Sequence, residues 1–242
     1  MERIGVIPAR LASTRLPEKI LREIAGKPMI QHVWERASKS ECLDTVLVAC
    51  DDERIRKCVK DFGATAVMTS PDHPSGTDRI AEAVKDLDVN VVVNIQGDEP
   101  LVDPAMIDEL VGVIESEESC TMATLAHAID DDDEILDPSV VKIVLDQKGY
   151  ALYFSRAAIP FNRAGEQIQY HKHIGMYAYR KSFLMQFVQL PQTQLEKVEK
   201  LEQLRVLESG FEIKVGVTEL DSVGVDTEKD LEKVEQMIKG GV

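Results

Sequence analysis

The sequence of 242 residues lacks the features that mark several classes of protein. Its four cysteines show neither CxxC spacing nor the density of a disulfide scaffold, so we expect reduced thiols and a cytoplasmic location. Apolar runs are too short to span a bilayer, and Arg10 closely follows the first one, so neither a membrane span nor a signal peptide is expected. The sequence has no GxxxxGK[ST] loop and no GxGxxG after its first apolar run, which argues against a P-loop enzyme and a nicotinamide dehydrogenase.

Positive charge is also scarce, with 28 Lys and Arg against 43 Asp and Glu and a net charge of -15. The electrostatic field of this net negative charge repels nucleic acid and anionic membranes, and we expect neither as a partner. Against this background, the segment PARLASTRLPEK gathers Arg10, Arg15 and Lys19. Any one of these cations alone would be an ordinary solvated residue. Three beside a strand end favour a site for an anionic group such as a triphosphate.

Apolar periodicity predicts an α/β fold in the first half of the chain. Four apolar runs have the length of buried strands: residues 3–7, 45–49, 64–68 and 89–95. Helical spacing follows each run: residues 28–37, 53–61, 80–87 and the segment after Asp103. This alternation predicts a mostly parallel, Rossmann-like sheet flanked by helices. Because ligands bind at the carboxyl ends of such strands, the rim should carry the first loop, CDDE, HPSGTDR and QGDEP.

The pattern changes from about residue 121. Residues 140–157 resemble two strands around a turn at Gly149, and residues 171–180 another strand. We therefore expect one domain over residues 1–242, with a smaller antiparallel lobe inserted at about 140–180. A single helix is expected at about 193–209, then a strand and a last helix that starts near Thr227.

Two aspartates are candidates for a metal site. Asp98 follows the most apolar run, and carboxylate oxygens are what Mg²⁺ prefers. An Asp turn before a helix that begins with proline is an equally good explanation for Asp98 alone. Asp226 lies at the mouth of the last helix, where a carboxylate needs no functional reason.

A third group of candidates lies in the second half of the chain. His171 and His173 share a strand face with Tyr177 and Tyr179. Since no Cys or carboxylate cluster completes a zinc site, a polar sugar pocket is the more plausible interpretation. An ordinary half-buried strand with aromatic packing remains the alternative.

Seven motifs occur in an order that resembles the 3-deoxy-manno-octulosonate cytidylyltransferases, the CMP-Kdo synthetases. They are IPARLASTRLPEK, HPSGTDR, VNIQGDEP, GYALYFSRAAIP, HIGMYAY, LEQLRVL and GVDTEKDL. The resemblance covers nearly the whole chain. It implies the reaction CTP + Kdo → CMP-Kdo + pyrophosphate for lipopolysaccharide synthesis, Mg²⁺ as cofactor, and a homodimer to which the antiparallel lobe contributes.

The resemblance also implies residue roles. The nucleotide would contact Ala9, Arg10, Arg15, Lys19, Ser75, Gly76, Arg79 and Gln96. The sugar would contact Gln96, Arg156, His173, Tyr177, Glu202 and Gln203. Mg²⁺ would be held by Asp98 and Asp226. The catalytic residues would be Arg10, Lys19, Asp98 and Asp226.

Two alternatives stay open at this point. A related cytidylyltransferase could use sialic acid or an amino-modified Kdo, which a comparison of sugar acids would separate. A regulatory protein could bind a sugar nucleotide without catalysis, although pure binding does not require the carboxylates of both Asp98 and Asp226.

Overall fold

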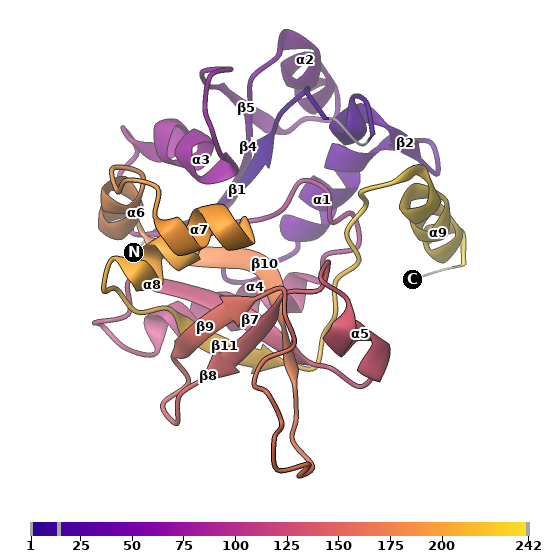
Figure 1. Cartoon of the computed structure of the whole chain (residues 1–242). Coiled ribbons are helices and arrows are strands. Elements are labelled where there is room, and N and C mark those ends of the chain that lie inside the picture. Colours follow the sequence, from indigo (N-terminus) through magenta and orange to yellow (C-terminus); the bar gives the residue numbers. More distant parts are fainter. Residues whose placement is uncertain (1, 14–15, 241–242) are drawn as a thin grey trace. The chain divides into compact units, whose positions relative to one another are not determined.

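The structure is a computed structural model that describes residues 2–13 and 16–240 (Figure 1). The chain forms two compact units, one made of residues 1–108 with 222–242 and the other of residues 109–221. The predicted α/β class, with a mostly parallel sheet and flanking helices, is confirmed. The prediction of one domain with a lobe at about 140–180 stays a prediction.

The first unit contains four parallel strands in the order β6-β1-β4-β5. Their bounds are Val91–Asn94 for β6, Arg3–Ala9 for β1, Thr45–Cys50 for β4 and Thr65–Met68 for β5. All of β6 and most of β1 are buried, which explains their continuous apolar sequences. Since the strands are parallel, their carboxyl ends share one edge, where the site is built.

Helices follow the strands as the sequence predicts. Their bounds are Met29–Ala37 for α1, Glu53–Asp61 for α2, Gly76–Val84 for α3 and Pro104–Glu115 for α4. Asp52 caps α2 and Ser75 caps α3 by accepting backbone N–H groups. Between β1 and α1 lie a 3-10 turn, η1 (Lys19–Leu21), and the hairpin β2 (Glu23–Ile24) and β3 (Lys27–Pro28).

The last helix, α9 (Glu228–Lys239), packs into the first unit beside β2 (Figure 1). Thr227 and Asp230 form the capping box at its start, as predicted. The buried core beneath the helix consists of Leu16, Ile24, Met29, Leu101, Val225, Leu231 and Val234. This apolar contact anchors the segment that carries Asp226.

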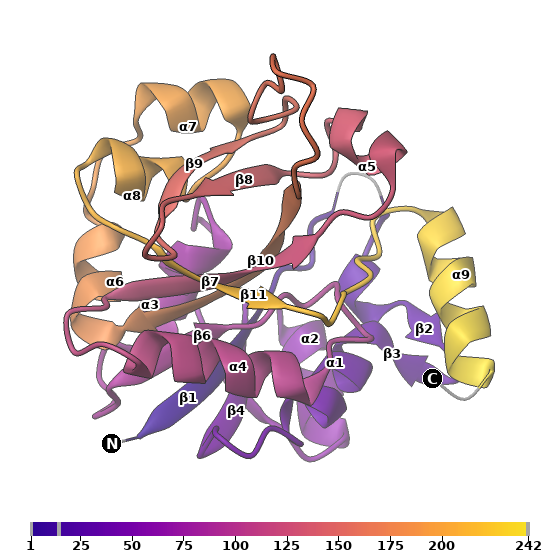
Figure 2. The same ribbon diagram turned by 90° about the horizontal axis from the view of Figure 1, so that it is seen from below.

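The second unit contains five strands in the order β11-β7-β10-β8-β9 (Figure 2). Their bounds are Lys214–Thr218 for β11, Met122–Ala128 for β7, His171–Arg180 for β10, Lys142–Leu145 for β8 and Ala151–Ser155 for β9. Strand β11 runs parallel to β7, and the remaining pairs are antiparallel. The predicted turn at Gly149 is confirmed, since this residue has φ of 78°.

The expected single helix at about 193–209 is wrong. The second unit has α5 (Asp132–Leu136), α6 (Lys181–Phe187), α7 (Gln194–Glu199) and α8 (Leu204–Glu208). Lys200 ends α7 with φ of 56°, a left-handed conformation that apolar periodicity does not reveal. Arg205 of α8 then donates two hydrogen bonds to Glu196 of α7, at 2.8 and 2.6 Å, which holds the two helices together.

The four cysteines are free thiols. Within residues 2–13 and 16–240, no helix is both long and apolar enough to cross a membrane.

Candidate active site

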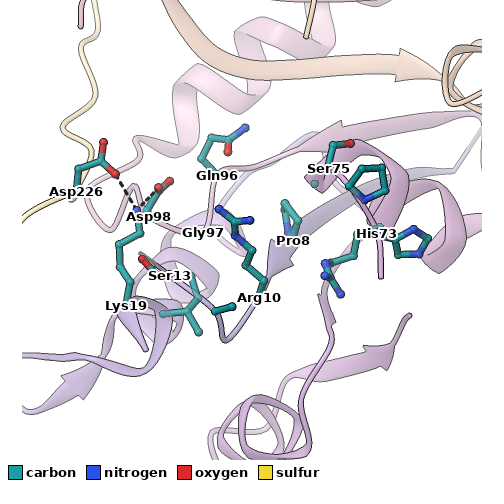
Figure 3. A pocket seen from close by; sticks show the side chains of 15 residues that line it. Pro8, Arg10, Ser13, Lys19, His73, Ser75, Gln96, Gly97, Asp98 and Asp226 are labelled. Carbon is teal, nitrogen blue, oxygen red and sulfur yellow. Dashed lines mark hydrogen bonds and ion pairs between the residues drawn. The ribbon is translucent and has the colours of Figure 1, made fainter. Parts of the chain in front are cut away.

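A cavity of about 330 Å³ opens where β1 and β6 end and α3 begins (Figure 3). Every residue that lines it belongs to the first unit. These residues are Pro8, Arg10, Ala12, Ser13, Lys19, Ile20, His73, Pro74, Ser75, Gly76, Arg79, Gln96, Gly97, Asp98 and Asp226. The cavity thus brings together three of the four motifs predicted at this rim, all except CDDE, and adds Asp226 from the far end of the chain.

Lys19 lies between the two aspartates at one end of the cavity. Its Nζ is 2.6 Å from Asp98 Oδ2 and 3.0 Å from Asp226 Oδ1 (Figure 3). The lysine side chain is 14% exposed, and those of Asp98 and Asp226 are 35% and 43% exposed, so all three remain accessible from the cavity. A single ammonium group therefore neutralises part of the charge of two carboxylates that lie 128 positions apart in sequence.

Backbone contacts fix this pair of carboxylates. The N–H of Val225 donates to the carbonyl of Asp98 at 2.9 Å, and Val225 itself is fully buried in the core beneath α9. Gly97, just before Asp98, has a close neighbour on the side where a Cβ would lie. An added Cβ would be 3.0 Å from the backbone oxygen of Pro8 and 2.8 Å from Cδ1 of Ile20. Glycine lets the chain pass this close to β1.

The donor set fits Mg²⁺ that is shared with a phosphate ligand. Carboxylates are suitable hard oxygen ligands, and Mg²⁺ in phosphate-transfer sites takes one or two of them, with phosphate and water completing six positions. Among the described residues, no group of three or more His, Cys, Asp or Glu is placed to hold a metal alone. Asp98 and Asp226 are the residues that would hold the ion, with a cation already favoured between them.

Arg79, another residue of the cavity lining, takes part in a buried network. Its guanidinium, 3% exposed as a residue, donates to Thr69 Oγ1 at 2.7 Å and to Asp51 Oδ2 at 3.0 Å. Asp51 Oδ1 accepts the backbone N–H of Leu11 at 3.0 Å. The sequence predicts Asp51 as a rim residue within CDDE, at the end of β4, but predicts no contact for it. The nucleotide contact expected of Arg79 stays a prediction.

Among the described residues, the other predicted nucleotide residues lie at the cavity or next to its lining in sequence. In Figure 3, Arg10 reaches into the middle of the pocket between Asp98 and Pro8, while Ser75 lies at the far end. The Ser75 hydroxyl accepts the N–H of Asp78 and donates to the carboxylate of that residue. Ala9 is fully buried as the last residue of β1. Further site positions are Gly76 and Gln96, which line the cavity, and Arg15, which lies outside the described residues.

His73 lines the cavity next to Ser75 and contacts Glu82 of α3 through Nε2. Glu82 also accepts the backbone N–H of Ser70 at 2.9 Å. This backbone hydrogen bond and then the contact with His73 lower the pKa of the Glu82 carboxyl. The side chain of Glu82 thereby fastens the loop that precedes α3 to the helix itself.

The predicted sugar residues other than Gln96 lie in the second unit. Arg156 follows β9, and its Nε donates to the Glu199 carbonyl and its Nη1 to the Pro138 carbonyl, both at 2.9 Å. His173 and Tyr177 lie on β10 with ring centroids 5.4 Å apart. The sugar contacts expected of Arg156 and His173 stay predictions.

Glu202 and Gln203 lie between α7 and α8. Gln203 is 4% exposed, and a Glu202 carboxylate oxygen is 3.8 Å from the Arg205 guanidinium. Burial, followed by the nearby Tyr179 and Glu202, raises the pKa of Tyr177 well above its ordinary value. The sugar contacts expected of Glu202, Gln203 and Tyr177 stay predictions.

Comparison with known proteins identifies the family. The sequence pattern of the cytidylyltransferases matches residues 4–215. The 3-deoxy-manno-octulosonate cytidylyltransferase of Geobacter sulfurreducens is 48% identical over 97% of this chain and 98% of its own length. That of Syntrophobacter fumaroxidans is 51% identical over 97% and 96%. A solved structure of CMP:2-keto-3-deoxy-manno-octonic acid synthetase complexed with CTP matches with a TM-score of 0.96 and 42% identity, over 100% of both chains. The resemblance found in the motifs is therefore confirmed, and the chain belongs to the 3-deoxy-manno-octulosonate cytidylyltransferase family.

Proposed function

We propose that this protein transfers CMP from CTP to the anomeric hydroxyl of 3-deoxy-manno-octulosonate (Kdo), giving CMP-Kdo and pyrophosphate for lipopolysaccharide synthesis. The observation that carries the proposal is the pair Asp98 and Asp226 around Lys19, in a cavity that also contains Arg10. Relatives at 48% and 51% identity over nearly the whole chain carry the name of this activity.

The chemistry follows from charge and position. The Kdo hydroxyl oxygen attacks the α-phosphorus in line, its proton is released, and the bond from the α-phosphorus to the bridging oxygen of pyrophosphate breaks. Mg²⁺ bound by Asp98 and Asp226 would neutralise phosphate charge and favour ionisation of the attacking hydroxyl. Arg10 and Lys19 hold the phosphates and stabilise charge on the leaving pyrophosphate. This use of the cations explains why they gather within a strongly acidic protein.

The sugar acid requires a different set of groups. Arg156 is a suitable partner for the Kdo carboxylate, because a guanidinium offers several donors in a fixed plane. Polar side chains of Gln96, His173, Tyr177, Glu202 and Gln203 supply donors and acceptors for the hydroxyl groups of the sugar.

We further propose a homodimer that uses the second unit. Leu152 of β9, Val198 of α7 and Phe161 are 62%, 74% and 86% exposed. Ser155 of β9 donates to Glu199 of α7 at 2.6 Å, so the elements that carry Leu152 and Val198 adjoin each other. Exposed apolar side chains of this size are typical of a protein interface.

We also propose a cytoplasmic location, with which the free cysteines agree.

The test measures pyrophosphate release from CTP in the presence of Mg²⁺, with and without Kdo. ATP, GTP and UTP in place of CTP serve as controls. Release that requires both CTP and Kdo supports the proposal. Release with CTP and only another sugar acid, such as sialic acid, would keep the nucleotide site and overturn the substrate. No release with any pair would indicate a binding protein without catalysis.

A further inference from the structure

Strand β10 contains an irregularity next to His173. The register pairs Ile174 with Leu125 of β7 and then Tyr177 with Thr124, so two residues of β10 bulge out between these pairs. Because an insertion of two residues preserves the alternation of side chains, His173 and Tyr177 remain on the same face. Their ring centroids are accordingly only 5.4 Å apart.

Thr124 lies under this bulge and is fully buried. Its Oγ1 is 3.0 Å from Nε2 of His173, 3.1 Å from the carbonyl oxygen of Ile174 and 2.8 Å from the carbonyl oxygen of Met176. One hydroxyl group thus contacts three polar atoms of β10.

The number of available protons determines the direction of these hydrogen bonds. Two of the three contacts are to carbonyl oxygens, which only accept, so the single hydroxyl proton of Thr124 is best placed between Oγ1 and one of these carbonyls. The contact between Thr124 Oγ1 and His173 Nε2 then needs a proton on the nitrogen. The heavy-atom distances therefore favour the Nε2–H form of His173, in which Nδ1 carries a lone pair if the ring is neutral.

The surroundings of His173 support a neutral and fixed ring. Burial lowers the pKa of His173 to about 3, so the imidazole carries no charge near pH 7. The ring of Phe154 meets it edge-on, with centroids 5.0 Å apart and an interplanar angle of 82°. Tyr177 packs on it as described above, and the two aromatic contacts limit rotation of the imidazole.

We propose that Thr124 is a positioning residue that holds His173 as the Nε2–H tautomer, so that Nδ1 accepts a hydrogen bond from a hydroxyl group of the sugar acid. The inference rests on the proposed function, because it takes Kdo as the ligand. A neutral Nδ1 acceptor cannot bind a carboxylate, since neither group has a proton to donate. His173 therefore recognises the polyol part of the substrate, and the carboxylate is left to a cation such as Arg156.

The first experiment observes the tautomer directly and needs no activity. Protein labelled with ¹⁵N-histidine is studied at pH 7.5 by long-range ¹H–¹⁵N correlation, with His173 assigned from the spectrum of His173→Gln. We expect a neutral ring with the proton on Nε2. A proton on Nδ1, or an imidazolium, in the wild-type protein would overturn the proposal.

The second experiment removes the hydroxyl at nearly constant volume. Thr124→Val should lose the single tautomer and raise the KM for Kdo roughly three- to tenfold, which is the effect of one hydrogen bond, while the KM for CTP stays the same. Thr124→Ser keeps the hydroxyl and should restore both the tautomer and the KM for Kdo. The role of Thr124 would also be overturned if Thr124→Val lost the single tautomer of His173 but kept the wild-type KM for Kdo.

A matched control removes a buried hydroxyl elsewhere in the same unit. Thr218 of β11 is 3% exposed, and its Oγ1 accepts the N–H of Leu220 at 3.1 Å. Thr218→Val should leave the His173 spectrum and the KM for Kdo unchanged, and an equal change in both variants would contradict a specific role for Thr124. If wild-type protein shows the Nε2–H tautomer but releases no pyrophosphate from CTP and Kdo, the proposed function fails while the tautomer assignment stands.

Discussion

Asp51 and Arg79 form a buried ion pair in the wall of the cavity, with 3.0 Å between Oδ2 and Nη2. Their side chains are only 11% and 4% exposed. The other oxygen of Asp51 accepts the N–H of Leu11, the residue after Arg10. One carboxylate therefore neutralises a buried cation and also fixes the chain where it leaves β1 for the cavity.

Asp51→Asn should destabilise the protein by about 3 kcal/mol, because it removes the carboxylate charge that pairs with the buried guanidinium of Arg79. The amide oxygen could still accept the N–H of Leu11, so the effect reports mainly the lost charge. Urea unfolding at pH 7 measures it. The matched control is Arg56→Gln, which breaks the exposed pair of Arg56 and Glu53 in α2 and should cost less than about 1 kcal/mol. Equal small losses in the two variants would contradict this role of Asp51.

Asp98→Asn and Asp226→Asn should each lower kcat roughly a hundredfold or more, because either change weakens the site for the metal that stabilises transition-state charge. Pyrophosphate release measured over a range of Mg²⁺ concentrations tests both. Asp103→Asn provides the matched control, since Asp103 accepts the N–H of Ala105 at the start of α4 and Asn caps a helix equally well. Near-normal turnover in either cavity variant would rule out its role as a metal ligand.

Lys19→Met should leave the two carboxylates of the cavity to repel each other in metal-free buffer. We expect a lower melting temperature in EDTA and a larger rise on addition of Mg²⁺ than in wild type, because the ion would replace the missing positive charge. Thermal unfolding in both buffers measures the difference. A variant whose melting temperature does not respond to Mg²⁺ would contradict binding of the ion by the two carboxylates in the absence of CTP.

The sequence predicted the first unit well because its signals are local. Apolar runs mark the strands, helical spacing of apolar residues marks the helices that follow them, and parallel strands bring their carboxyl ends to one edge. The spacing of residues in the sequence could not reveal that Asp98 and Asp226 both contact Lys19. That arrangement depends on α9 packing back into the first unit, a long-range contact that only the resemblance to a family indicated.

Other features were out of reach for different physical reasons. The break between α7 and α8 depends on a left-handed backbone at Lys200, which has no glycine or proline to signal it. The network of Asp51 depends on which atoms meet once Arg79 is buried. The role of Thr124 depends on a bulge in β10, and a residue pattern of period two gives no warning of one.

Gly97→Ala should lower both stability and activity. The new Cβ would meet the backbone oxygen of Pro8 at 3.0 Å, so the chain that carries Asp98 must move, at a cost of about 1–3 kcal/mol. Gly112→Ala is the control, because Gly112 is an exposed residue within α4 and a Cβ there meets no described atom within 4 Å. It should stabilise the protein by about 0.5–1 kcal/mol. Urea unfolding measures the stability of the two variants, and pyrophosphate release measures their activity. A Gly97→Ala variant with wild-type kcat would contradict the need for the chain at Gly97 to pass close to Pro8.

The low pKa of His173 predicts how stability changes with pH. An ordinary histidine titrates near 6.5, whereas burial lowers the pKa of His173 to about 3 in the folded protein. Below pH 6.5 the histidine is therefore protonated in the unfolded chain but stays neutral in the folded protein. The contribution of His173 to the free energy of unfolding is complete above pH 6.5 and decreases as pH falls from 6.5 toward 3.

Comparison with His173→Gln isolates this contribution, because the other titrating groups are common to both proteins. The difference in unfolding free energy between wild type and variant should shift by about 1 kcal/mol, to the disadvantage of wild type, between pH 7.5 and pH 5.5. Urea unfolding at the two pH values measures it. If the difference is the same at both, His173 titrates normally in the folded protein and its ring is not held neutral by burial.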